Sequence, residues 1–239
     1  MKLLMRWTLA MGVFTILSCN TTTDTKEQDA AFDYVVGQFA DIKVLRYQIP
    51  GFEDLTLKEQ KLVYYLTQAG MEGRDIMWAQ NYRHNLTIRK ALEQVYQNYQ
   101  GDRNADQWLS FDTYLKRVWF SNGIHHHYSN AKIMPEFSQE YLTQLLVATG
   151  AELSGEAFDV IFDDHDAKKV DLSKDSDIVL NSAINMYGPD VTTADVEAFY
   201  GKMTVDADQP IEIGLNTRLV KENGVLTEQV YKSGGLYGT

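Results

Sequence analysis

The chain has 239 residues, of which 44% are hydrophobic and 12% aromatic, a composition typical of a globular protein and unlike that of a disordered one. Its formal net charge of −11 argues against nucleic acid as a partner, because binding a phosphate backbone requires a basic surface. The same charge makes an anionic membrane surface a poor electrostatic match.

The N-terminus has the pattern of an export signal. Lys2 and Arg6 give a positive start, residues 7–17 form an apolar run too short to span a bilayer, and ILSC ends at Cys19, the only cysteine. This resembles a bacterial lipobox. We therefore expect a signal peptide over residues 1–18, a lipidated tether over 19–28, and export to a bacterial membrane on its periplasmic or cell-surface side. An ordinary secretory signal with an incidental cysteine is the alternative.

The next hundred residues predict mainly helices. Residues 29–46 are apolar-rich and predict a helix followed by an extended segment. Thr56, followed three residues later by Glu59, has the capping-box pattern that starts a helix. Behind it an apolar stripe recurs at steps of three and four, with small residues that would let a second element approach closely: Leu62, Tyr65, Leu66, Ala69, Gly73, Ile76 and Met77. Two further apolar faces predict the following helices: Ile88, Leu92, Val95 and Tyr99, then Trp108, Phe111, Leu115, Val118 and Trp119.

The remaining chain predicts more helices and one hairpin. Ser138 can cap a helix whose apolar face is Tyr141, Leu142, Leu145 and Leu146. Residues 156–177 predict a short helix and an exposed acidic loop, and residues 178–186 a helix. Thr192 with Asp195 predicts another helix start. Near the end the period changes to two: Ile211, Ile213 and Leu215 alternate, Asn223-Gly224 suits a two-residue turn, and residues 225–231 return as the second strand.

Six segments, in order, resemble the N-terminal region of the bacterial dipeptidyl peptidase III family: FADIKVLRYQIPGF, LTLKEQKLVYYLTQAGMEGRDIMWAQN, NGIHHHYSNAKIMPEFSQEYL, NMYGPDVTTADVEAFY, GLNTRLVKENG and SGGLYG. Members of that family are zinc-dependent exopeptidases that remove dipeptides from peptide N-termini. The resemblance covers nearly all of the chain after residue 30. It implies an α+β fold, mostly helical with a C-terminal β-hairpin, that forms part of the β-barrel-bearing lobe of a two-lobed peptidase. Residues 29–239 would be the N-terminal, incomplete part of that lobe.

The zinc-binding segments of that family are missing from this chain. They are His-Glu-x-x-Gly-His and Glu-Glu-x-x-Ala-acidic, whereas no histidine here precedes a glutamate and no two glutamates are adjacent. We therefore expect no catalytic residue, no metal ligand and no cofactor in this chain, with zinc and short peptide substrates belonging to the full-length enzyme. His125–His127 are adjacent, and consecutive residues point in divergent directions unless the loop folds back, so packed imidazoles in a polar loop are favoured over a metal site. Asp163, Asp164 and Asp166 lack the glycine and terminal glutamate of a calcium loop.

Asn216 and Arg218 are the candidate substrate-cleft residues. They lie in GLNTRLVK, one of the better matches, and an arginine can hold a substrate carboxylate through two hydrogen bonds. A strand arginine paired with a neighbouring acid is the alternative interpretation.

The expected function is that of an N-terminal fragment of a dipeptidyl peptidase III-like enzyme, inactive alone. A standalone lipid-anchored binding or interaction protein that has lost catalysis is the alternative, and a truncated gene would give the same sequence. Because a lone hairpin is marginal in water and its edges invite pairing, we also expect the incomplete fold to self-associate.

Overall fold

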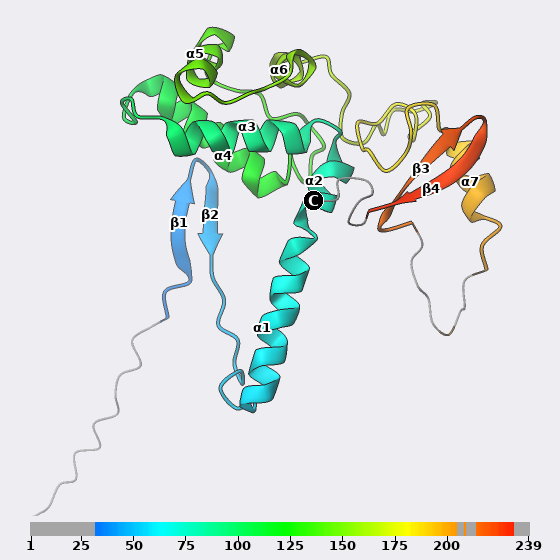
Figure 1. Ribbon diagram of the computed structural model, residues 1–239, viewed down its shortest axis with the longest axis horizontal. Helices are drawn as coiled ribbons and strands as arrows, with labels where there is room; N and C mark the ends of the chain where they lie inside the picture. Colours follow the sequence, from blue (N-terminus) through cyan, green and yellow to red (C-terminus); the bar gives the residue numbers. More distant parts are fainter. Residues whose placement is uncertain (1–31, 205–207, 209–213, 232–239) are drawn as a thin grey trace, which may run out of the picture.

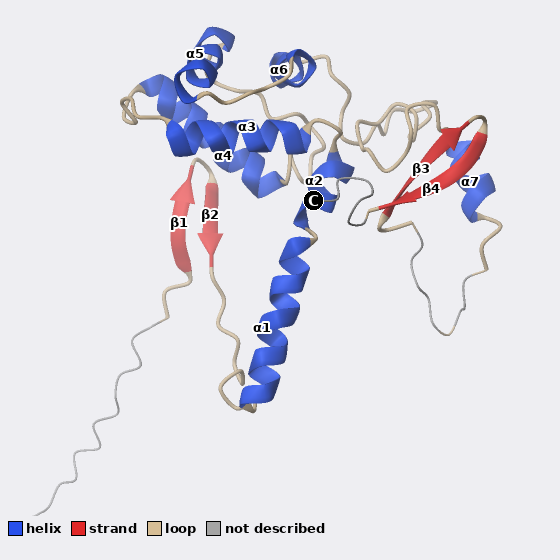
Figure 2. Cartoon of the chain, viewed as in Figure 1, coloured by secondary structure: helices blue, strands red, loops and turns tan. Residues whose placement is uncertain are grey.

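The computed structural model describes residues 32–204, 208 and 214–231 (Figure 1). The expected signal peptide, Cys19 and the tether lie outside these residues. Helices and strands follow one another as β1 (Val35–Phe39), β2 (Ile42–Leu45), α1 (Leu57–Glu72), α2 (Arg74–Asn81), α3 (Asn85–Asn98), α4 (Asp106–Ser121), α5 (Gln139–Thr149), α6 (Gly155–Phe162), α7 (Thr193–Tyr200), β3 (Thr217–Glu222) and β4 (Val225–Val230). The two hairpins form separate antiparallel sheets (Figure 2), so the predicted α+β class is confirmed.

The core lies between helices α2 to α6, with α3 at its centre. Helix α3 contacts α4, α5 and α6, and Figure 1 shows α3 and α4 side by side beneath the other two. The predicted apolar faces supply the fully buried side chains of the core, among them Ile88, Leu92, Val95, Phe111, Leu115, Val118, Leu142 and Leu145. Burying such a side chain contributes about 1.5–3 kcal/mol, so this cluster is the main source of stability in the described chain.

The predicted helix starts are confirmed by their caps. In α1 the Thr56 backbone N–H donates to Glu59 Oε2 at 2.8 Å, and the Glu59 N–H donates back to Thr56 Oγ1. Thr192 and Asp195 form the same reciprocal pair before α7, and Ser138 Oγ accepts from the backbone N–H of Tyr141 before α5. Each cap satisfies a backbone donor that has no partner inside its helix.

The apolar stripe predicted on the first helix is not buried, and that interpretation was wrong. No residue of α1 is buried, and Leu62 and Leu66 are 58% and 62% exposed. Helix α1 points away from the core (Figure 1), and a side chain at Gly70 would meet nothing within 4 Å. The pattern is amphipathic, but no element approaches it among the described residues. Ile76 and Met77 belong to α2 instead, which begins after Gly73.

Residues 32–46 form the β1–β2 hairpin, and the predicted helical start was wrong for this part of residues 29–46. Ala40 takes a left-handed φ of 46° at the turn, and the Arg46 N–H donates to the Tyr34 carbonyl at 2.9 Å. A short apolar run such as this is compatible with helix or strand from its pattern alone. An ion pair of 2.6 Å between Arg117 of α4 and Asp41 ties the turn to the core.

The predicted turn of the C-terminal hairpin is confirmed, but its first strand begins later in the sequence than predicted. Asn223 and Gly224 both have positive φ, 52° and 80°, as a two-residue I′ turn requires. Strand β3 begins at Thr217, whereas Leu215 lies before it in a turn and is 53% exposed. Ile211 and Ile213, which were predicted to belong to this strand, lie outside the described residues.

Residues 178–186 form turns, so the predicted helix was wrong. The Asp177 carboxylate accepts from the backbone N–H groups of Val179 and Leu180, which starts only a single turn. The backbone after this turn forms hydrogen bonds to residues far away in the sequence. The Asn185 N–H donates to the Gln80 carbonyl at 2.7 Å, and the Leu219 N–H donates to the Met186 carbonyl at 3.0 Å. This segment therefore joins α2 to β3, a role that a helix could not fill because its backbone groups would bond internally.

One buried amide holds three helix ends together. Asn85 is 1% exposed; its Nδ2 donates to the Trp78 carbonyl at 3.2 Å, and its Oδ1 accepts from the Ile124 N–H at 3.1 Å. Gly123 crosses it with φ 149°, and a Cβ there would come within 2.2 Å of Asn85 Nδ2. The junction of α2, α3 and α4 thus requires glycine at this position.

Candidate functional site

A small cavity of about 230 Å³ lies where the helical core meets the C-terminal hairpin. Its walls come from the two residues after α2, the loop after α6, residues 179–189 and strand β3. The charged side chains lining it are Arg83, Asp166 and Arg218. The cavity therefore combines residues far apart in the sequence, held by the backbone bonds that residues 185–188 make to Gln80 and Leu219.

Arg218 lines this cavity and has no counterion among the described residues. It precedes the fully buried Leu219 in β3, and because side chains alternate along a strand the two point to opposite faces. The Nε atom of Arg218 is buried and has no hydrogen-bond partner. Within the described residues no ion pair reaches Arg218, so the alternative pairing with a neighbouring acid is not observed. Asn216 is exposed, precedes the strand and does not line the cavity.

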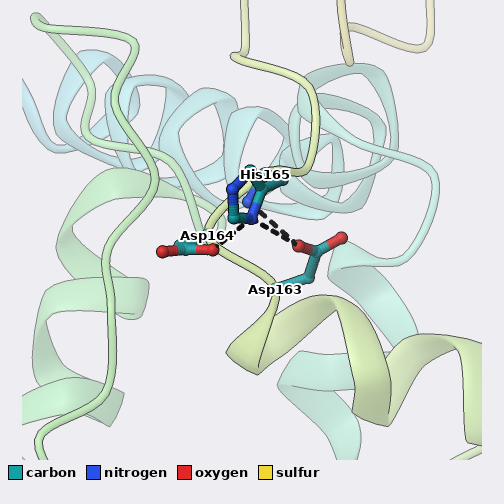
Figure 3. A group of neighbouring side chains, drawn as sticks. All are labelled: Asp163, Asp164 and His165. Carbon is teal, nitrogen blue, oxygen red and sulfur yellow. Dashed lines mark hydrogen bonds and ion pairs between the residues drawn. The ribbon is translucent and has the colours of Figure 1, made fainter.

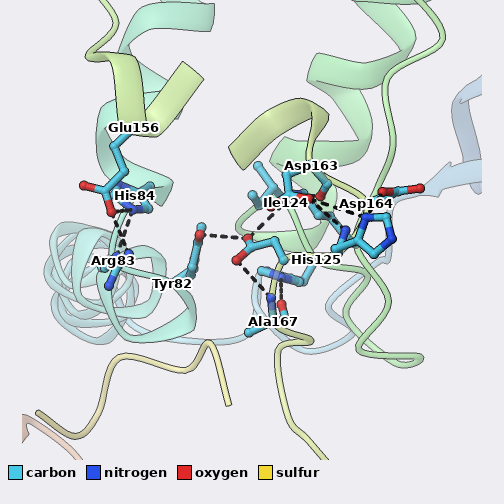
Figure 4. A network of polar contacts seen from close by, with 12 residues as sticks. Tyr82, Arg83, His84, Ile124, His125, Glu156, Asp163, Asp164 and Ala167 are labelled. Atoms are coloured by element: carbon cyan, nitrogen blue, oxygen red, sulfur yellow. Dashed lines mark hydrogen bonds and ion pairs between the residues drawn. The ribbon is translucent and has the colours of Figure 1, made fainter. Parts of the chain in front are cut away.

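Tyr82, Asp166 and Ala167, which also line the cavity, belong to a polar network (Figure 4). Tyr82 donates its hydroxyl proton to Asp166 Oδ2 at 2.8 Å, and the Ala167 N–H donates to Asp166 Oδ1 at 2.9 Å. Lys132 Nζ lies 3.6 Å from Asp166. Burial, reinforced by the Asp166 hydrogen bond, raises the pKa of Tyr82, so the phenol stays protonated and remains a donor. The Asp166 carboxylate therefore already has partners in Tyr82, Ala167 and Lys132.

The three adjacent histidines have three different environments. His125 is 2% exposed, lies edge-on to Tyr82 and has Nε2 3.0 Å from the Ala167 carbonyl, while burial lowers its pKa. A neutral ring with the proton on Nε2 fits that contact, since a carbonyl can only accept. His126 Nδ1 accepts backbone N–H groups of the following turn, and His127 packs against Phe120 and Tyr128. Among the described residues these rings do not converge into a metal-ligand set.

Among the described residues, Asp163, Asp164 and His165 are the group whose ligand atoms lie close enough together to hold a metal ion, all within 4.8 Å (Figure 3). His165 Nδ1 is 2.5 Å from Asp164 Oδ1, and its side chain is 90% exposed. All three side chains are exposed, whereas ligands in protein metal sites are usually fixed by a shell of hydrogen bonds around them. The predicted exposed acidic loop is the description that the geometry supports.

Sequence patterns could not reveal the cavity. Arg218 was noticed through its segment, but Tyr82 and Asp166 are 84 positions apart and neither belongs to a motif. The one local signal is the polar triplet at 82–84, which interrupts the helical pattern between α2 and α3.

No protein-family model matches this chain, and no curated protein matches it either. The family resemblance of its six segments therefore stays a prediction.

Proposed function

We propose that this chain is the non-catalytic N-terminal part of an exported, lipid-anchored exopeptidase of the dipeptidyl peptidase III type. The whole enzyme would remove dipeptides from the N-termini of short peptides, and this chain would build one wall of its substrate cleft. The ordered resemblance of the six segments suggests the family. The observation that carries the proposal is the pair of uncovered apolar elements, α1 and the β1–β2 hairpin.

Helix α1 has 16 residues and none of them is buried, although its sequence is rich in leucine and tyrosine. Isolated helices of about this length are marginal in water, because helix nucleation is costly and most helical stability in proteins comes from packing. The β1–β2 hairpin has the same problem: Tyr34, Val36 and Leu45 are each about half exposed or more, and a two-stranded sheet is marginal on its own. Both elements are therefore expected to be covered by further protein surface in the working enzyme.

Zinc, which the family requires, is not assigned to this chain. A catalytic zinc site needs three protein ligands, an open position and a carboxylate near the bound water. The His125–His127 rings do not converge, and the Asp163–His165 group consists of exposed consecutive residues. Neither fits the role, so no chemical step is attributed to the described residues.

Extending the gene product tests the proposal. We expect the reading frame to continue beyond codon 239 into a His-Glu-x-x-Gly-His segment, and its full product to release dipeptides from chromogenic dipeptidyl substrates in a zinc-dependent way. The 239-residue chain alone serves as the matched control and should release none. An authentic stop codon followed by unrelated sequence would overturn the proposal and favour the standalone lipid-anchored binding protein, for which the cavity beside Arg218, formed within this chain, would be the binding site.

A further inference from the structure

The guanidinium of Arg218, which pairs with no acid in the part of the chain that the structure describes, is the feature that the proposed function leaves unexplained. Its Nε is enclosed by protein and has no hydrogen-bond partner. A buried donor without an acceptor is costly, and native proteins satisfy nearly all such groups. Other arginines have carboxylate partners: Arg83 pairs with Glu156 at 2.6 Å, and Arg89, whose Nε also lacks a hydrogen bond, pairs with Asp75 at 2.8 Å. Arg218 is different because it lines a cavity and no ion pair reaches it from the described residues.

The charges around the cavity restrict what the acceptor can be. Asp166 is engaged by Tyr82, Ala167 and Lys132, so it does not neutralise Arg218. Its negative charge in the same cavity wall would repel a second negative charge on a ligand. A monoanion is therefore favoured over a phosphate dianion.

The shape of the cavity restricts the ligand further. The two terminal amino groups of a guanidinium form a fork that matches the two oxygens of a carboxylate. Val179, Ile184 and Pro189 also line the cavity and offer apolar contacts to a short hydrocarbon part. The volume of about 230 Å³ lies below the range of about 300–1,000 Å³ that is common for ligand pockets, so the ligand is small.

We propose that this cavity is a binding site for a small carboxylate, held by the Arg218 guanidinium with its short apolar part against Val179 and Ile184. The carboxylate belongs either to a free small acid or to the C-terminal residue of a short peptide. The proposal depends only on residues of this chain and stands whether or not the chain belongs to a zinc peptidase.

Binding to the full chain in detergent, followed by NMR and calorimetry, tests the site. The probes are propionate, tri-alanine with a free carboxylate, tri-alanine amide and inorganic phosphate. We expect saturable binding of the first two, accompanied by a shift of the Arg218 Nε–H resonance, and weaker or no binding of the amide and phosphate. Tighter binding of tri-alanine than of propionate would identify the peptide terminus as the natural ligand, and the reverse order a free acid.

Arg218→Lys keeps the charge but removes the fork, and should weaken carboxylate binding about tenfold, the effect of one charge-assisted hydrogen bond. Arg117→Lys makes the same change at an arginine that faces Asp41, away from the cavity, and should bind as the wild type does. The proposal is overturned by equal affinity in Arg218→Lys, by phosphate binding more tightly than the carboxylates, or by carboxylate binding that leaves the Arg218 resonance unmoved. Because that resonance is read in the wild type, the result does not depend on how well the variant folds.

Discussion

The exposed face of α1 gives the most direct test of the fold. Replacing Leu62 and Leu66 together by glutamine should leave the free energy of unfolding within about 0.5 kcal/mol of the wild type, as for ordinary surface substitutions. The reason is that these side chains are 58% and 62% exposed and no residue of α1 is buried. Glutamine also has a helix propensity close to that of leucine, so the helix itself should persist.

Self-association should respond strongly to the same change. Full burial of a leucine contributes about 1.5–3 kcal/mol, and with about six-tenths of each side chain still open, covering it would contribute about 1–2 kcal/mol. A symmetric dimer that packs α1 on α1 would cover four such side chains. Losing them should therefore cost at least about 4 kcal/mol, or a factor of about 10³ in the dimer dissociation constant.

Sedimentation equilibrium measures the association, and urea unfolding followed by circular dichroism measures the stability. Leu92→Ala is the buried control: Leu92 is fully buried in α3, and its truncation should lower the free energy of unfolding by about 2–5 kcal/mol. A loss of comparable size in the α1 double variant would show that the α1 face is buried within the monomer. An unchanged dissociation constant would show that α1 does not mediate association.

Three further predictions concern the anchor, the metal and pH. Cys19→Ala should release the protein from the membrane fraction, and unchanged partitioning into detergent would exclude lipidation there. The purified chain should contain no stoichiometric zinc by metal analysis; one tightly bound zinc per chain would contradict this, and the Asp163–His165 group would then be the first site to test. Burial lowers the pKa of His125, so below about pH 6.5 the unfolded chain takes up a proton at this ring that the folded chain does not. The free energy of unfolding should therefore decrease as the pH is lowered. Urea unfolding at pH 7.5 and 5.5 should show a smaller loss for His125→Gln than for the wild type, and an equal loss in both would refute this role for the ring.

The sequence predicted those parts of the fold that depend on local chemistry. Caps such as Thr56 with Glu59, and the turn at Asn223-Gly224, were found because their residues meet their partners within a few positions. The faces of α3, α4 and α5 were found because helical periodicity marks which side chains will be buried. Periodicity does not say whether a partner is present, which is why the equally regular face of α1 was misjudged.

The failures occurred where distant segments decide the outcome. Residues 178–186 have a helical pattern, but their backbone is used by Gln80 and Leu219. Arg218 could be singled out as a candidate because arginine is a common carboxylate ligand, whereas its cavity could not, since Tyr82 and Asp166 meet only in the folded chain. A single candidate residue can be proposed from the chemistry of its side chain, but a cavity cannot, because its walls are brought together by tertiary contacts.

The crossing of Asn85 and Gly123 has a consequence for how sequences with this fold can diverge. Gly123 is held by two separate constraints, its φ of 149° and the amide that would lie 2.2 Å from any Cβ, whereas Asn85 is held only by its hydrogen bonds. A smaller residue at 85 removes the steric conflict but leaves the backbone strain at 123. Divergent relatives should therefore include proteins that keep Gly123 and replace Asn85, but none that keep Asn85 and replace Gly123.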